Sequence, residues 1–185
     1  MSLEELWTLF PIVLREHNPK YAAWYEEEQT ILIDALKDCG IFRINHIGST
    51  AVPGLIAKPI IDILLELKKG FDIEAVASIL INKGWNIMAR DDVAQTLDLN
   101  KGYTPQGFAE RIYHLHIKTA GDWGELYFRD YLQRHPAVAK EYEQLKLILK
   151  DMFKHNRDAY TAAKTEFIQK HTQAARDEFG SRHYL

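Results

Sequence analysis

The chain has 185 residues, of which 46% are apolar and 26% charged, and its formal net charge is −3. This length and apolar content suit one globular domain with a sizeable core. The charge balance argues against a strongly basic surface, so we do not expect nucleic acid as a partner. A single cysteine, the lack of an apolar run of about 18 residues and the lack of a signal pattern predict a cytoplasmic protein without a membrane partner.

The first 40 residues predict two helices and one strand. Residues 2–5 form a capping box for a short helix, and residues 12–14 have the character of an edge strand. Asn18 and Pro19 are typical of a helix start, and the helix should run to Lys37. Acidic residues 26–28 are expected on its solvated face. Its apolar face is expected to contain Ala22, Tyr25, Ile31, Leu32 and Leu36.

Two strands flank a loop rich in proline and glycine between residues 48 and 59. Residues 42–47 alternate between apolar and polar, which is the pattern of a half-buried strand. Residues 60–67 are almost continuously apolar and predict a central strand covered on both faces. Asp62 interrupts that run. A buried carboxylate needs a cation, a metal or hydrogen-bond donors, and the alternative is satisfaction by loop amides.

The loop itself has the residues of a phosphate site. Backbone N–H groups and the hydroxyl at Gly48-Ser49 can bind phosphate oxygens, and Thr50 follows them. Lys58 is expected either to neutralise a ligand anion or to pair with Asp62. His46, two residues before the glycine, is interpreted either as a phosphate-binding or acid–base group or as a hydrogen-bonded strand histidine.

Between residues 70 and 118 the pattern predicts a helix and three strands. The helix spans residues 72–83, and the strands span residues 85–89, 96–99 and 112–118, with a capped turn around Asp91-Asp92. A polar loop is expected before the last strand. Its two ends are Lys101 and Arg111, and both are assigned to ligand binding.

His114 and His116 lie on the last predicted strand. Residues at i and i+2 project from the same face of a strand about 6.6 Å apart, near enough to serve one ligand or metal. Together with Asp62 they would form a site of one carboxylate and two imidazoles. Such a set suits a single transition metal such as zinc, or a phosphate bound by protonated histidines. The alternative is a pair of histidines bonded to neighbouring side chains.

Helical periodicity begins at Asp122, which is expected to cap the first of three helices. The second helix begins at Pro136 and runs to about Lys154, and the third runs from Arg157 towards Phe179. The third helix places three polar residues, Arg157, Tyr160 and Lys164, along one stripe at i, i+3 and i+7. The stripe is interpreted as an anion-binding surface, as ordinary surface, or as part of ion pairs with Arg129 and Asp130.

These elements predict an α/β (α+β) fold with a mixed sheet, flanking helices and a C-terminal helical part. We expect one domain over residues 1–185, with an α/β core over about 11–121 and helices over about 122–185.

The run HIGSTAVPGLIAKPIIDI, from His46 to Ile63, resembles the GrpB family, which is similar to the nucleotidyltransferase superfamily. The segments YHLHIK, YFRDYLQRHPAVAKEYEQLK and RDAYTAAKTEFI also fit that family. Phe128-Arg129-Asp130, and then Arg157, Tyr160 and Lys164, belong to these matches. The resemblance therefore implies a nucleotidyltransferase-like fold and adds Arg129 to the expected ligand-binding residues.

Active nucleotidyltransferases carry Gly-Ser, then two acids at i and i+2 on the next strand, and a third acid on a neighbouring strand. Gly48-Ser49 and Asp62 match this pattern, but Leu64 stands in place of the second acid. The His-Leu-His run falls where the third acid is expected. The resemblance implies a catalytic set of Asp62, His114 and His116 that uses a divalent metal, Mg or Zn.

Three functions remain open from the sequence. The first is transfer of a nucleotidyl or phosphoryl group, with a phosphorylated or otherwise anionic small molecule as the ligand. The second is a catalytically inactive binding or scaffolding domain, for which a protein partner is expected. The third is metal-dependent phosphoester hydrolysis by the same histidines.

Overall fold

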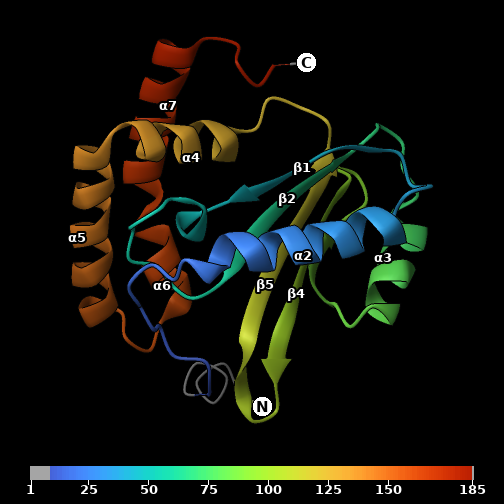
Figure 1. Cartoon of the computed structure of the whole chain (residues 1–185), viewed down its shortest axis with the longest axis horizontal. Helices are drawn as coiled ribbons and strands as arrows, with labels where there is room; N and C mark the ends of the chain where they lie inside the picture. The colour runs from blue at the N-terminus through green and yellow to red at the C-terminus, as the bar shows by residue number, and fades with distance from the viewer. Residues whose placement is uncertain (1–8, 185) are drawn as a thin grey trace.

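The computed structural model describes residues 9–184. The short helix predicted for residues 2–5 lies outside the described residues. The described part contains a five-stranded mixed sheet and helices (Figure 1). None of its helices combines the length and the apolar character needed to cross a membrane.

The sheet has the strand order β1-β2-β5-β4-β3. The strands are β1 (Ile41–Ile47), β2 (Ile61–Leu67), β3 (Asn86–Asp91), β4 (Thr96–Thr104) and β5 (Gly107–Thr119). Only β2 and β5 pair in parallel, whereas the other neighbours are antiparallel. The apolar run therefore forms an inner strand, as the sequence predicts, and it brings the predicted acid next to the strand that carries the two histidines.

Side chains of β2 alternate between two environments. Ile61, Ile63 and Leu65 belong to the main core, which lies between the sheet and the helices α2 (Lys20–Ala35) and α3 (Ile73–Asn82). Figure 1 shows α2 running across the sheet. The even-numbered residues point to the opposite face. There Leu64 packs against Leu126 of α4 (Gly124–Arg134).

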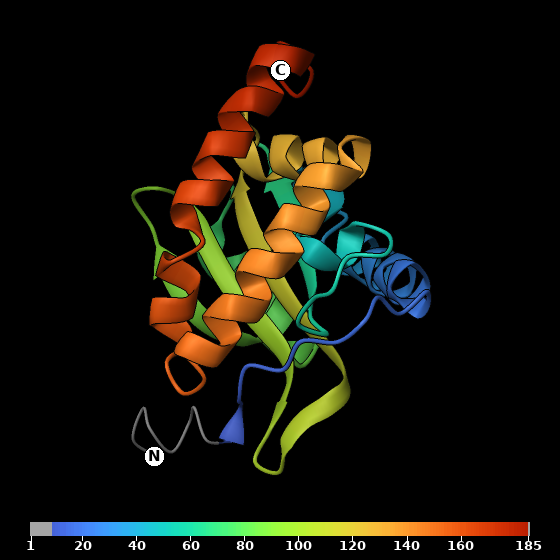
Figure 2. The same ribbon diagram turned by 90° about the vertical axis from the view of Figure 1, so that its left-hand side faces the viewer.

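The C-terminal part contains four helices, which Figure 2 shows gathered beside the sheet. After α4 come α5 (Pro136–Met152), α6 (Arg157–Ala162) and α7 (Thr165–Phe179). The prediction of one continuous helix after Arg157 is wrong, because the helix ends at Ala162 and a new helix starts at Thr165. The break places Lys164 in the junction between α6 and α7.

The structure corrects the interpretation of the first helix and of the segment before it. Residues 12–14 form no strand; this segment contributes only an isolated bridge between Arg15 and Ala57. In α2, Ile31 is exposed, whereas Glu28, which was expected on the solvated face, is buried. Glu28 can be buried because Lys101 of β4 forms an ion pair with it.

Two further predictions fail for local reasons. The segment from Lys101 to Arg111 is not a loop, because β4 and β5 continue through it as a hairpin that bulges at Gly102. Gly102 has a φ of 94°, and a Cβ there would lie 2.3 Å from the carbonyl oxygen of Arg111, so only glycine fits. Asp122 does not cap α4; Trp123 holds that position, and Asp122 pairs with Arg176.

Candidate functional site

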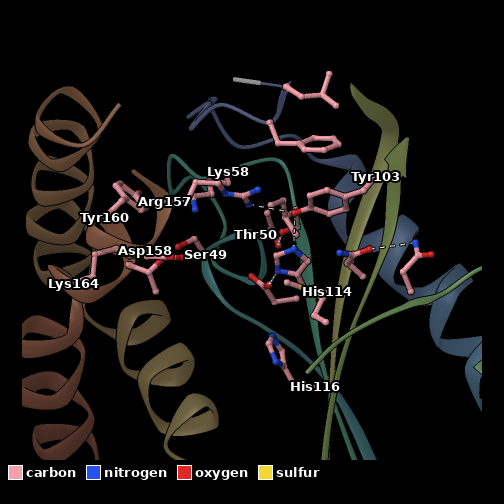
Figure 3. A pocket seen from close by; sticks show the side chains of 18 of the residues that line it. Ser49, Thr50, Lys58, Tyr103, His114, His116, Arg157, Asp158, Tyr160 and Lys164 are labelled. Carbon is pink, nitrogen blue, oxygen red and sulfur yellow. Dashed lines mark hydrogen bonds and ion pairs between the residues drawn. The ribbon is translucent and has the colours of Figure 1, made fainter. Parts of the chain in front are cut away.

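A cavity of about 880 Å³ opens on the face of the sheet opposite α2. Its wall combines the loop after β1, the strands β2 to β5, and the helices α5 and α6 with the junction to α7. Such a volume suits a small-molecule ligand. Figure 3 shows Lys58, Arg157, Tyr160 and Lys164 on one side of this cavity, with His114 and His116 facing them from the strand.

The three residues predicted to form a metal site lie together in this cavity. Asp62 is the register partner of His114 across the parallel β2–β5 pair, and His116 follows two residues later on the same face. One potential ligand atom from each of the three lies within 4.8 Å of the others. The structure therefore gathers these side chains into one cluster, which is a candidate site for one ion.

Both histidines are oriented by a second hydrogen bond. The Nε2 atom of His114 lies 2.7 Å from the hydroxyl of Tyr103, and the Nδ1 atom of His116 lies 2.7 Å from a carboxylate oxygen of Asp98. These contacts leave Nε2 of His116 for a metal, whereas Nδ1 of His114 faces Asp62, with 3.4 Å between Nδ1 and Oδ1. Metal-binding histidines usually donate their other ring N–H to a carboxylate or similar acceptor, so the donor set fits a divalent transition metal.

Burial and neighbouring charges oppose each other in setting the pKa values of Asp62 and His116. Burial alone would raise the pKa of Asp62, but the hydrogen bond and charge of His114, with His116 and Lys164, hold it below its usual value. Asp62 is therefore a carboxylate at neutral pH. Burial would lower the pKa of His116, yet the hydrogen bond to Asp98 and the charge of Asp62 outweigh it and raise that pKa.

The glycine of the Gly-Ser pair makes room for the acid. Gly48 has a φ of 71°, and a Cβ at this position would lie 2.4 Å from Oδ2 of Asp62. A larger residue would displace the carboxylate, so the strand and the loop are matched at this point. Ser49 begins the short 3-10 helix η1 (Ser49–Ala51), and Thr50 is buried within it.

Four cationic side chains line the side of the cavity next to the loop and the helices: Lys58, Lys146, Arg157 and Lys164. The ammonium groups of Lys58 and Lys164 lie 4.6 and 4.5 Å from the ring centre of Tyr160. Lys146 donates to Ser49 Oγ at 3.2 Å and to the carbonyl of Ile56. We refer to these four residues as the cationic wall.

Two lysines of the cationic wall lose their protons easily in the unliganded protein. Burial, together with the charges of Lys164 and Arg157, lowers the pKa of Lys58 to about 7 against the attraction of Asp62. Burial and the charge of Lys164 likewise lower the pKa of Lys146 to about 7. A bound anion would reverse this effect by stabilising the protonated lysines. The wall is therefore suited to phosphate or another multiply charged anion.

Six of the residues assigned to ligand binding line the cavity with the three metal-site residues, and five do not. Those that line it are Ser49, Thr50, Lys58, Arg157, Tyr160 and Lys164. Those that do not are His46, Gly48, Lys101, Arg111 and Arg129. The stripe predicted for the third helix thus reaches the cavity in spite of the helix break.

Lys101 and Arg111 instead attach the hairpin to α2. The ammonium of Lys101 lies 2.8 and 3.0 Å from the two carboxylate oxygens of buried Glu28, and Arg111 pairs with Glu27. The extended hairpin explains this outcome, because it holds both cations against the helix rather than in a mobile loop.

Arg129 and His46 form part of the scaffold beneath the loop. Arg129 donates to the carbonyl of His46 at 3.0 Å and to Asp130 at 2.8 Å. His46 stacks on Tyr25, and its Nε2 lies 3.0 Å from Oγ1 of Thr50. Since that hydroxyl donates to the carbonyl of Ile60, it accepts from a neutral His46. His46 therefore has the contacts expected of the second interpretation, a hydrogen-bonded strand histidine.

The buried position of His46 predicts a pH-dependent stability. Burial lowers its pKa to about 4 from 6.5. Because the unfolded chain binds this proton first, the free energy of unfolding should fall as the pH drops from about 6.5 to about 4, by up to about 3 kcal/mol. Urea unfolding of the wild type and of His46→Asn at several pH values measures this difference. His155→Asn, at an exposed position, is the control; identical pH slopes for wild type and His46→Asn would contradict the assignment.

Sequence reasoning missed three residues of the site. Tyr103 was hidden because the strand β4 is longer than its apolar pattern indicates, and Asp98 because its partner His116 lies on another strand. Lys146 lies in an amphipathic helix, where a lysine normally faces solvent, yet it is 2% exposed. The alternation of β4 was the one available signal, since Asp98 and Asn100 occupy the polar positions between Leu97 and Leu99.

Comparison with solved structures defines the class of fold. The structure matches the Cid1 poly(U) polymerase with a TM-score of 0.52 at 10% sequence identity, over 87% of this chain and 51% of that chain. This likeness shows a nucleotidyltransferase-type fold. The structure of this chain also matches that of the conserved protein GrpB from Enterococcus faecalis. The TM-score is 0.76 at 31% identity, over 90% of this chain and 99% of the other.

The family model described as "GrpB protein" matches residues 11–174, and the chain therefore belongs to the GrpB family. A UPF0157 protein of Pseudomonas aeruginosa is 37% identical over 82% of this chain, and UPF0157 protein YqkA of Bacillus subtilis is 33% identical over 83% of it. The alignments cover 62% and 44% of those two proteins, so this chain spans only part of their length.

Proposed function

We propose that this protein binds the phosphate groups of a nucleotide and transfers a nucleotidyl group to a small molecule. The observation that carries the proposal is the position of Asp62, His114 and His116 next to the cationic wall within one cavity. The nucleotidyltransferase-type fold supports the same class of reaction.

The residues of the cavity would have different roles in this reaction, according to their chemistry. Asp62, His114 and His116 would hold one divalent metal, which when bound polarises a phosphoryl oxygen and neutralises charge there. The cationic wall binds the remaining phosphate oxygens, and Ser49 with the backbone of η1 adds hydrogen bonds. In the transfer, the oxygen of an acceptor hydroxyl forms a bond to the α-phosphorus and gives its proton to water, while the bond to diphosphate breaks. Positive charge on Lys58 and Lys164 then stabilises the leaving diphosphate.

A second candidate function is ligand binding without catalysis. Leu64 occupies the position of a second carboxylate, and it is fully buried against Ile47 and Leu126. This residue contributes to the core and offers no ligand to a second ion. A two-metal mechanism of the usual kind is therefore not available to β2, and the wall alone would serve an inactive nucleotide-binding domain.

Incubation with nucleoside triphosphates labelled at the α-phosphate, with Mg²⁺, Mn²⁺ or Zn²⁺ and pooled small metabolites, separates the candidates. Transfer gives labelled product together with diphosphate, whereas phosphoester hydrolysis gives labelled nucleotide without a labelled adduct. Nucleotide binding without turnover would support the inactive domain. No binding of any triphosphate would contradict the proposal.

Nucleotide binding should be coupled to proton uptake. Lys58 and Lys146, each with a pKa of about 7, are largely neutral at about pH 8.5 in the free protein and gain protons beside bound phosphate. The affinity should therefore fall as the pH rises above about 7. Calorimetry in two buffers of different ionisation enthalpy measures the uptake, which Lys58→Gln should reduce and exposed Lys69→Gln should leave unchanged. Equal uptake in the wild type and Lys58→Gln would contradict this role.

A further inference from the structure

The metal-site residues belong to a polar row that continues across the sheet. Asp62 is in register with His114, His114 with Asn100 on β4, and Asn100 with Asn86 on β3. Register partners on neighbouring strands point to the same face, so all four side chains face the cavity side. His114, Asn100 and Asn86 also line the cavity. The floor of the cavity therefore extends two strands beyond the metal site.

The two ends of the cavity differ in charge. Within residues 9–184, the four cations that line it come from the loop, α5, α6 and the junction to α7, and Asp158 of α6 adds one acid on that side. The residues of β3 and β4 that line it within the described part of the chain are uncharged: Asn86, Met88, Asn100, Tyr103 and Thr104. Asp98, two residues from Asn100 on the same face of β4, keeps a side chain that is 42% exposed. The end formed by β3 and β4 is thus unsuited to an anion.

The two amides at this end retain capacity for hydrogen bonding. Each carboxamide offers one acceptor oxygen and two N–H donors. Within residues 9–184, their side chains make one hydrogen bond, in which Asn86 Nδ2 donates to Asn100 Oδ1 over a long 3.4 Å. The side chain of Asn86 is exposed, and the neighbouring Met88 is 56% exposed. Adjacent amides with free donors and acceptors match the hydroxyl groups of a polyol.

We infer that Asn86 and Asn100 form the acceptor subsite, which binds a neutral, hydroxyl-bearing second substrate. This inference rests on the proposed function, because it places the acceptor opposite the phosphates with the metal-site residues between them. A nucleotide bound at the cationic wall and a polyol bound at the amides would meet at Asp62 and His114. The order of the residues across the sheet would therefore bring the two substrates together. We infer a neutral acceptor because the two ends of the cavity differ in charge.

Nuclear magnetic resonance of the whole chain labelled with ¹⁵N tests the subsite without any need for activity. The probes are glycerol, ribose and myo-inositol as neutral polyols, and inorganic diphosphate as the anion. At least one polyol should shift the side-chain amide signals of Asn86 and Asn100, and diphosphate should shift signals of the cationic wall instead. The Asn100→Leu variant should bind that polyol about fivefold or more weakly, which corresponds to the loss of about one neutral hydrogen bond.

Controls separate the subsite from the proposed function. Asn100→Leu should bind diphosphate as the wild type does, and Asn82→Leu, at an exposed position at the end of α3, should leave both affinities unchanged. If diphosphate binds but no polyol shifts the two amides, or if diphosphate itself shifts them, the acceptor subsite is wrong and the phosphate site stands. If diphosphate does not bind at the wall, the proposed function fails, whatever the polyols do.

Discussion

Replacement of Asp62 by asparagine is expected to lower the affinity of the protein for a divalent transition metal by more than about a hundredfold. Loss of a hydrogen-bonded partner behind a ligand typically costs a factor of about 10–100, and Asp62 would be a ligand itself. Within the described residues, it is also the only carboxylate in the cluster with His114 and His116. The amide removes the negative charge and keeps the size of the side chain, so the backbone of β2 should not move.

Titration with Co²⁺ measures this effect, because the visible absorption of bound Co²⁺ reports both affinity and geometry. Asp34→Asn provides the matched control, since Asp34 lies exposed on α2. Circular dichroism should show the same fold for the wild type and both variants. A Co²⁺ affinity of Asp62→Asn within about threefold of the wild type would contradict the metal site and leave the cationic wall as the only anchor for phosphate.

The second large effect concerns stability. Replacement of Arg43 by methionine should lower the free energy of unfolding by about 3–5 kcal/mol, because it leaves a buried carboxylate without its cation. Glu66 on β2 is 0% exposed, and it accepts hydrogen bonds from the guanidinium of Arg43 and from the backbone N–H of Gly121 at 3.0 Å. Arg43 also donates to the carbonyl of Gly121 at 2.7 Å. The pair fixes the connection between β5 and α4.

Urea unfolding of Arg43→Met and of the double variant Arg43→Met/Glu66→Leu tests the cause. The double variant removes the buried charge as well as its partner, so it should regain most of the lost stability. Recovery of less than about 1 kcal/mol would mean that packing of the arginine, rather than the stranded charge of Glu66, accounts for the loss.

The elements that hold Asp62, His114 and His116 could be predicted because their patterns are local. The apolar run of β2, its single acid and the His-Leu-His alternation of β5 each define which face a side chain takes. The parallel pairing of β2 with β5 then brings Asp62 beside His114. That pairing is not a local property, but it follows from the fold that the family resemblance implies.

The remaining assignments depended on lengths and partners that no local pattern encodes. Lys101 and Arg111 look like loop cations because Gly102 interrupts the pattern, whereas a bulge absorbs that glycine and the hairpin continues. Glu28 looks like a solvent-facing acid because its burial depends on Lys101, 73 residues away. Lys146 reaches the cavity only because α5 packs against the loop, so its role could be seen only in three dimensions.

The alternation of β2 also limits how such a protein can diverge. One side of this strand builds the core through Ile61, Ile63 and Leu65, while Asp62 on the other side faces the cavity. Insertion or deletion of one residue would move every following side chain to the opposite face, and both the core packing and the cavity lining would be lost. The strand therefore tolerates few changes. New ligand preferences would have to arise in the loop around Lys58, in the α6–α7 junction and at the outer amides of β3 and β4, where replacements leave the core untouched.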